Sequence, residues 1–308
     1  MPSILRRIRV PFRLSGLMDR WAAPRLPSVQ TRPRPRFTTT GPPPLADLLG
    51  RPAVNLDTPE LQRFLAGKRV LVTGAGLGIG QAIVRELAIQ GARVCVHTSA
   101  TPPDETVDLI HAIGSDAVSV RGDLAQLADC SRVVDEAAAA LGGLDALVAA
   151  AGIINTTPFF ETTVAELRTL FDVNVIGSFL TVREGAKYMQ KGARICMVAS
   201  ISSYTGGGYV ARGAYATSKG AVLTMMKSCA RELGPKGIAV NAVAPGFIDT
   251  PFVSSAMSDP KRRREVEAAV GKVGTAEQIA ECCAWLVSPA ADFVHGETMI
   301  ADGGILMR

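Results

Sequence analysis

The stretch Arg69-Val-Leu-Val-Thr-Gly-Ala-Gly-Leu-Gly-Ile-Gly80 decides the fold of this 308-residue chain. Residues 69–73 form a β-branched apolar run that predicts a buried strand, and apolar residues at helical spacing continue from the last glycine to Gln90. A glycine-rich turn between a strand and a helix lets the backbone approach a pyrophosphate, and the helix N-terminus adds free N–H groups. The stretch therefore predicts a dinucleotide site at Gly74, Gly78, Ile79 and Gly80.

Strands and helices alternate in the residues that follow. The patterns predict strands over 93–98, 117–121 and 145–149, with helices over 104–113 and 125–141 between them. This alternation is typical of an α/β fold with a doubly wound, mainly parallel sheet.

The end of the second predicted strand bears on the choice of cofactor. It lies about 20 residues past the glycines, where an acidic residue would hold the ribose 2′-hydroxyl of NAD. The sequence there is His97-Thr98-Ser99, with no carboxylate to repel a 2′-phosphate and two hydroxyls to bind one. No Arg or Lys follows, and Leu77 is also neutral. We expect NADP in preference to NAD as the cofactor, and NAD remains the alternative.

Asp123 follows the third predicted strand. Its carboxylate is placed to accept a hydrogen bond from an adenine amino group. It could equally be the N-cap of the helix that we expect to begin near Ala125.

Tyr215 and Lys219 are four residues apart, so a helix would place both on one face. A free phenol has a pKa near ~10, and a nearby ammonium favours the phenolate and lowers that pKa. The spacing alone is also common on helix surfaces. However, the strand predicted over 194–199 ends in Ser200-Ile-Ser-Ser203, and residues 206–208 are glycines. These polar groups are expected to meet in one cleft at the carboxyl end of this strand. They predict an active site in which Tyr215 transfers a proton.

Two further features lie near this edge of the sheet. Residues 149–151 are alanines followed by Gly152, small enough for a dinucleotide to pack closely against them. A helix predicted over 164–191 carries Asn174 in its interior, which is unfavourable unless the amide has a partner. From the residues alone, Asn174 is interpreted as an amide that packs this helix.

Over residues 67–308 the chain resembles short-chain dehydrogenases/reductases of the short, single-domain type. The matching motifs are Thr73-Gly74-x-x-x-Gly78-Ile79-Gly80, Asp123-Leu124, Asn174, the serines before Tyr215-x-x-x-Lys219, Pro245-Gly246 with Thr250, and Gly296 with Asp302-Gly303-Gly304.

This resemblance implies a Rossmann-like fold with a seven-stranded sheet, and hydride transfer between NAD(P) and a secondary alcohol or ketone. It implies a tetrad in which Tyr215 exchanges the proton, and Lys219 lowers its pKa and holds the nicotinamide ribose. A serine binds the substrate oxygen, and the Asn174 main chain and a helix kink position a water. The remaining cofactor contacts that it implies are Thr98, Ser99, Asp123, Gly152, Pro245, Gly246, the Ile248 backbone and the Thr250 hydroxyl.

The resemblance leaves several choices open. The family spacing of about thirteen residues favours Ser202, whereas the end of the strand favours Ser200, which we prefer. The family has Asn-Asn-Ala-Gly where this chain has Ala149-Ala150-Ala151-Gly152, so both amides that brace the cofactor floor are absent. A non-catalytic dinucleotide-binding or interaction protein is therefore the alternative function.

The substrate side and the assembly are also inferred from the resemblance. Residues 251–273 would form a lid over the substrate. Their basic run Lys261-Arg-Arg-Arg264 is either a solvated helix face or a group of charges that attracts an anionic substrate. The substrate is a sugar, polyol or sugar acid, or a 3-oxoacyl group. The helix over 275–287 and the strand over 298–301 resemble the surfaces through which the family forms homodimers and homotetramers.

The N-terminal region differs from the rest of the chain. Residues 1–44 are expected to be a basic Pro/Arg-rich extension, and the first 46 residues carry nine arginines against one acid, Asp19. Such composition fits a disordered extension or a mitochondrial transit peptide. Residues 45–67 are expected to form short helices leading into the catalytic domain at 68–308. This segment weakly resembles the one leading into the dinucleotide fold of nucleotide-sugar dehydratases, which favours a carbohydrate substrate.

Composition excludes several classes of protein. The six cysteines lack C-x-x-C spacing and histidine partners, so we expect reduced thiols and no metal site. No apolar run reaches the ~18 to 20 residues that span a bilayer, and the basic extension lacks the aromatic residues of a nucleic-acid arm. We therefore expect a cytoplasmic enzyme, or a mitochondrial one if the extension is a transit peptide, with no membrane or nucleic-acid partner.

Overall fold

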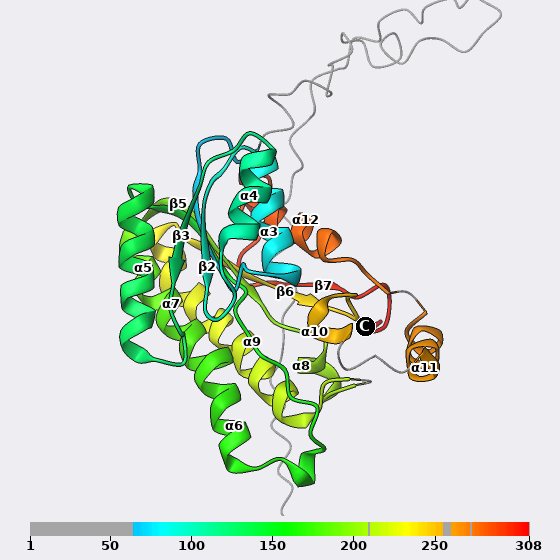
Figure 1. Cartoon of the computed structure of the whole chain (residues 1–308). Helices are drawn as coiled ribbons and strands as arrows, with labels where there is room; N and C mark the ends of the chain where they lie inside the picture. Colours follow the sequence, from blue (N-terminus) through cyan, green and yellow to red (C-terminus); the bar gives the residue numbers. More distant parts are fainter. Residues whose placement is uncertain (1–63, 209, 255–259, 272, 308) are drawn as a thin grey trace, which may run out of the picture. The chain divides into compact units, whose positions relative to one another are not determined.

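A computed structural model describes residues 64–208, 210–254, 260–271 and 273–307 (Figure 1). These residues belong to one compact unit, Leu56–Arg308. The expected basic extension and nearly all of the segment over 45–67 lie outside the described residues. The described end of that segment includes Leu65, which is buried in the core.

Seven parallel strands form one sheet in the order β3-β2-β1-β4-β5-β6-β7. Chain order along the sheet therefore reverses between β1 and β4, and ligands bind beside this point in doubly wound folds. The predicted fold class is confirmed. The strands are β1 (Arg69–Thr73), β2 (Arg93–Thr98), β3 (Ala117–Arg121), β4 (Leu144–Ala149), β5 (Met189–Val198), β6 (Ala239–Pro245) and β7 (Thr298–Ala301).

Helices cover both faces of the sheet because its strands are apolar on both sides (Figure 1). One face packs on α3 (Gly78–Ile89), α4 (Asp104–Ala112) and α12 (Ala276–Leu286). The other packs on α5 (Leu127–Leu141), α7 (Ser178–Gly185) and α9 (Gly213–Leu233). Shorter or peripheral helices are α6 (Val164–Phe171), α8 (Ser202–Thr205), α10 (Pro251–Ser254) and α11 (Pro260–Val270).

The helix predicted over 164–191 is confirmed as far as Tyr188, but it is not continuous and its last three residues are wrong. It divides into α6, a π-helical segment η2 (Asp172–Gly177), α7 and a 3-10 turn η3 (Ala186–Tyr188). β5 then begins at Met189, five residues earlier than predicted, because Met189 pairs with Leu144 of β4 and is buried there. Tertiary pairing overrides local helix propensity at this point.

Two glycines of the turn after β1 bring the backbone close together. Gly74 has a φ of +67°, and a Cβ there would lie 2.6 Å from the Ala151 Cα beyond β4. A Cβ on Gly80 would lie 2.0 Å from the carbonyl oxygen of Gly74. A larger side chain at either position would push the turn away from the sheet edge where the site is built.

Candidate active site

A cleft of about 680 Å³ opens at the carboxyl ends of the strands. All predicted site residues line it except Asn174 and Asp123. The cleft has two halves. The cofactor half is formed by the turn Gly74–Gly80 and the segment Thr98–Thr101, and the substrate half by residues after β4, β5 and β6.

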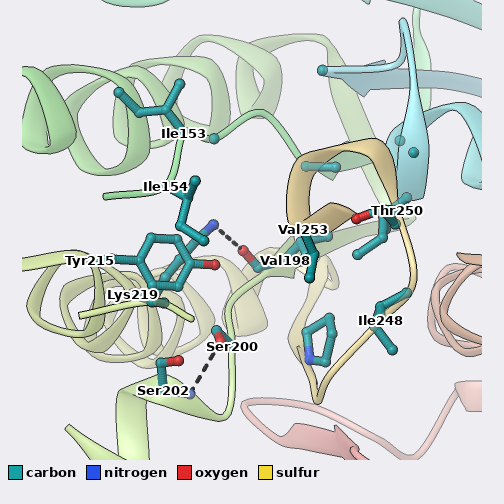
Figure 2. A pocket seen from close by; sticks show the side chains of 18 of the residues that line it. Ile153, Ile154, Val198, Ser200, Ser202, Tyr215, Lys219, Ile248, Thr250 and Val253 are labelled. Carbon is teal, nitrogen blue, oxygen red and sulfur yellow. Dashed lines mark hydrogen bonds between the residues drawn. The ribbon is translucent and has the colours of Figure 1, made fainter. Parts of the chain in front are cut away.

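Tyr215, Lys219 and Ser200 converge in the substrate half (Figure 2). Tyr215 and Lys219 lie one turn apart near the start of α9, with the ammonium 6.0 Å from the centre of the phenol ring. The Lys219 Nζ donates a hydrogen bond of 2.8 Å to the carbonyl oxygen of Val198 at the end of β5. Ser200, two residues further on, lies on the same side of the cleft as the Tyr215 phenol (Figure 2). The strand end and the helix thus bring three polar groups to one place.

The geometry favours Ser200 over Ser202 as the partner of Tyr215. Both serines are buried and line the cleft. However, Ser200 is the one whose side chain acts to lower the pKa of the phenol, and its Oγ accepts the N–H of Ser202 at 3.1 Å, which orients it. Ser202 is the first residue of α8.

Burial, rather than Lys219, dominates the acidity of Tyr215 in this cleft. Burial raises the pKa of Tyr215 to about 12, and the interaction with Ser200 only partly opposes it. Burial also lowers the pKa of Lys219 to about 8. The expectation that the ammonium lowers the phenol pKa stays a prediction, and the net pKa is raised because removal of the phenol from water is the larger effect.

Asn174 lies in the π-helical segment η2 and is fully buried. Its Oδ1 accepts the N–H of Ile153 at 2.8 Å, and its Nδ2 donates to the Ile153 carbonyl at 2.9 Å and to Ser218 Oγ at 3.0 Å. The amide is thus satisfied, as the residues alone indicated, and its helix is distorted, as the resemblance implied. Asn174 fixes the chain after β4 against α9.

The cofactor half fits a pyrophosphate. The N-cap of α3 is Leu77, whose side chain makes no capping bond, so the first N–H groups of this helix face the cleft without a side-chain partner. A Cβ on Gly76 would lie 3.0 Å from the Thr101 Cβ, so a larger side chain would crowd this cradle. These features match the positive helix end and close backbone that bind a dinucleotide.

His97 was not identified as a site residue from the sequence. It is buried at the end of β2, where its Nδ1 accepts the N–H of Gly74 at 3.2 Å and its Nε2 lies 3.1 Å from the Gly122 carbonyl. Burial lowers its pKa to about 4, which keeps the imidazole neutral. His97 therefore ties the glycine turn to β3. A histidine at this strand end was the available signal.

Arg121 supplies a cation near the predicted ribose site. It ends β3 opposite Thr98, and its guanidinium lies 3.4 Å from the carbonyl oxygens of Ser99 and Ala100. The sequence directly after Thr98 carries no Arg or Lys, and Arg121 comes from a neighbouring strand that is distant in the chain. The pairing of two parallel strand ends was the missing information.

Asp123 is exposed, and its Oδ1 accepts the N–H of Ala125 at 3.0 Å. The interpretation of Asp123 as the N-cap of the next helix is wrong, because α5 begins at Leu127 with Gln126 as its N-cap. An Asx turn places its carboxylate beyond β3 instead. Its predicted contact with adenine stays a prediction.

The Thr73 hydroxyl and two main-chain N–H groups brace the floor of the cleft where the family's amides are absent. The Thr73 Oγ1 accepts the N–H groups of Ala150 and Ala151, each at 3.1 Å. Thr73 is the last residue of β1, so the ends of β1 and β4 are held together without an asparagine side chain.

The segment after β6 carries Ile248 and Thr250 into the cleft together with Pro245 and Gly246 (Figure 2). Ile248 also bridges to Gly274.

Arg263 in the basic run of α11 pairs with Asp249 and Glu267 at 2.8 Å each. Among the described residues of this run, none lines the cleft. These contacts favour a solvated face that ties α11 to the segment after β6.

Known proteins match this chain along most of its length. The sequence model of a family described as enoyl-(acyl carrier protein) reductase matches residues 74–306. An L-rhamnose 1-dehydrogenase (NAD(P)(+)) from Azotobacter vinelandii is 35% identical over 80% of this chain and 99% of its own length. A cis-4-hydroxycyclohexanecarboxylate dehydrogenase from Sinomonas cyclohexanicum is 34% identical over 78% of this chain and 96% of its own length.

Solved structures agree with these relatives. A short-chain dehydrogenase from Burkholderia cenocepacia, crystallised with NADP, is 31% identical, with a TM-score of 0.72 over 78% of this chain and 98% of its own. Within the described part of this chain, no helix is long and apolar enough to cross a bilayer, and no cluster of His, Cys, Asp and Glu residues could hold a metal ion.

Proposed function

The chain belongs to the short-chain dehydrogenase/reductase family, and from this premise we propose that it is an NAD(P)-dependent oxidoreductase that interconverts a secondary alcohol and a ketone. The observation that carries the proposal is the convergence of Ser200, Tyr215 and Lys219 beside a cradle that fits a dinucleotide. The nicotinamide supplies or accepts the hydride when it is bound.

The residues of the substrate half handle the proton. For reduction of a ketone, the Tyr215 hydroxyl donates its proton to the carbonyl oxygen while Ser200 hydrogen-bonds the same oxygen and stabilises its developing charge. Because the pKa of Tyr215 is raised to about 12, the phenol is protonated at neutral pH, the state that this step needs. Lys219, held by the Val198 carbonyl, lies close enough to stabilise the phenolate that results.

We propose NADP as the preferred cofactor. Thr98 and Ser99 line the cleft where an acidic residue would select NAD, and Arg121 adds a positive charge beside them. The 2′-phosphate of NADP would interact favourably with both hydroxyls and with the guanidinium.

The test is a titration of the purified full-length chain with NADPH and NADH, followed by nicotinamide fluorescence. A panel of secondary alcohols is then oxidised with the better-bound cofactor. We expect tighter binding of NADPH and turnover of at least one alcohol. Tighter binding of NADH would overturn the cofactor preference, and binding of neither would favour the non-catalytic alternative.

We also propose a homodimer or homotetramer and a cytoplasmic location. Trp285 on α12, within the helix predicted to mediate assembly, is an exposed large apolar side chain, and Phe293 between the two predicted surfaces is another. Light scattering of the purified protein measures its mass. A mitochondrial location of a fluorescent fusion, lost on removal of residues 1–44, would instead identify a transit peptide.

A further inference from the structure

We infer that the substrate half of the cleft takes a ketone or secondary alcohol with an apolar body, in preference to a sugar or polyol. This inference rests on the proposed oxidoreductase function and specifies its substrate class. It is carried by six side chains that line the cleft around Tyr215, named here the apolar chamber: Ile153, Ile154, Val210, Phe247, Val253 and Ile305.

The walls of the apolar chamber come from four separate parts of the chain. Residues 153–154 follow β4, Val210 lies between α8 and α9, Phe247 and Val253 lie between β6 and the end of α10, and Ile305 follows β7. Val210 packs with Ile154, Phe247, Val253 and Ile305 in one cluster. Figure 2 shows Ile154 beside the Tyr215 ring and Val253 on the side toward which the Tyr215 hydroxyl points, with Ile153 further along the same segment as Ile154. Apolar surface therefore meets the substrate from several sides.

Few polar groups remain for a polyhydroxylated substrate. Among the described residues that line the cleft, none carries a carboxylate, an amide or a guanidinium group. Tyr215 and Ser200 are committed to the reacting oxygen and Thr250 is expected to bind the cofactor, which leaves the hydroxyl of Ser202. The Thr205 hydroxyl already donates to the Gly207 carbonyl at 2.6 Å. Each further substrate hydroxyl would move from water into the cleft and would not find a full set of hydrogen-bond partners there, which is unfavourable.

Apolar carbon, in contrast, gains from burial here. Each methylene removed from water improves binding by about fourfold, from about 0.8 kcal/mol. The branched side chains of valine and isoleucine are stiff, so little freedom is lost when a substrate packs on them. Hydrocarbon groups of a substrate therefore strengthen binding in this half of the cleft, and further hydroxyl groups weaken it.

The test compares cyclohexanol with myo-inositol, which share a six-carbon ring and differ in the number of hydroxyls. Oxidation by the full-length chain is measured with saturating NADP⁺. We expect kcat/KM for cyclohexanol to exceed that for myo-inositol by at least about a hundredfold, and decahydro-2-naphthol to exceed cyclohexanol by at least about tenfold. Binding of 2-decalone and of myo-inositol to the NADPH-loaded protein is measured in parallel by calorimetry.

Isosteric variants test the chamber itself. Val210→Thr and Val253→Thr add a hydroxyl without changing size, and we expect each to lower kcat/KM for cyclohexanol about tenfold with an unchanged Kd for NADPH. Val164→Thr, at an exposed valine on α6 that does not line the cleft, is the matched control and should change neither value.

The failures can be told apart. If the chain binds neither cofactor, the proposed function fails, and the inference fails with it. If it binds NADPH but oxidises myo-inositol as well as cyclohexanol, or binds no 2-decalone, the inference is overturned while the binding of NAD(P) stands. Unchanged kinetics in both threonine variants would likewise overturn it.

Discussion

The two halves of the cleft are built from different materials. In the cofactor half, backbone and glycine make the surface, and a Cβ on Gly80 would lie 2.0 Å from the Gly74 carbonyl oxygen. In the substrate half, the surface consists of branched apolar side chains such as Val210 and Val253, drawn from separate segments. The cofactor half requires glycine at particular positions, because a larger side chain would clash with the backbone. The substrate half requires only that its side chains be branched and apolar.

This difference explains how members of the family can act on different substrates while they share one frame, by which we mean the sheet, its flanking helices and the glycine turn. A pyrophosphate is the same in every member, so a glycine turn at a helix N-terminus serves all of them. A substrate is recognised by the side chains that loops bring to the carboxyl edge of the sheet, and loops tolerate replacement. Tyr215, Lys219 and Ser200 lie on the boundary, on elements of the frame.

The largest expected effect is at this boundary. Tyr215→Phe removes the proton donor and should lower kcat by roughly 10² to 10⁴, because that is the usual contribution of general acid–base catalysis. The NADPH Kd should change little, since the glycine turn that forms the cofactor half is intact. Stopped-flow turnover and fluorescence titration measure the two effects separately.

Tyr188→Phe is the matched control for this change. The Tyr188 hydroxyl donates to Asp135 at 2.7 Å and is exposed, away from the cleft. It should leave kcat within a factor of about two. Equal activity of Tyr215→Phe and the unmodified chain would show that the proton comes from another group.

The frame was predictable from sequence because each of its parts is a local pattern. The strand at 69–73, the glycine turn and the next two strands occupy the predicted residues, since alternating apolar runs and glycines specify them directly. The start of β5 was not predictable, because Met189 becomes a strand residue only by pairing with Leu144.

The same distinction holds within the site. The positions of Tyr215 and Lys219 on one helix follow from spacing, but the rise in the pKa of Tyr215 follows from burial by the surrounding chain. Arg121 and Thr98 are 23 residues apart and meet only through the register of β2 and β3. The apolar chamber gave no sequence signal, because scattered valines and isoleucines are also the residues of any core.

Gly80→Ala tests whether the cofactor half is sterically determined. The new Cβ meets backbone, which cannot rotate away, so we expect a loss of about 3 kcal/mol in the free energy of unfolding and a roughly hundredfold rise in the NADPH Kd.

Gly220→Ala in α9 is the control for this substitution. Nothing lies within 4 Å of its Cβ, and it should stabilise the chain by about 0.5 to 1 kcal/mol because alanine favours the helix. Chemical denaturation and fluorescence titration provide both measurements. Similar behaviour of the two variants would remove the steric contrast between the halves.

His97 gives the cofactor half a dependence on pH. Its pKa falls from 6.5 in the unfolded chain to about 4 in the fold, mainly because of burial. Between these two pH values the unfolded chain binds more protons than the folded chain, so the free energy of unfolding falls as the pH falls. The contribution of neutral His97 to stability is therefore complete above about pH 6.5 and is lost as the pH falls towards 4.

The free energy of unfolding should therefore decrease by about 2 kcal/mol between pH 7 and pH 5 through this residue alone. His97→Asn keeps an acceptor near the Gly74 N–H but does not titrate, so its loss over the same range should be smaller by that amount. Urea denaturation at both pH values measures the difference, and parallel curves for the two proteins would contradict it.

The smallest expected effect is at Thr73, which joins the halves. Thr73→Val keeps the shape but removes the acceptor for the Ala150 and Ala151 N–H groups, so we expect a loss of about 1 kcal/mol in stability. Because these residues lead to Ile153, the change should also raise KM for the substrate and the NADPH Kd, each about threefold, whereas Thr73→Ser should restore all three values. A variant that altered the cofactor Kd alone would show that the two halves are independent, and that the main-chain brace serves only one of them.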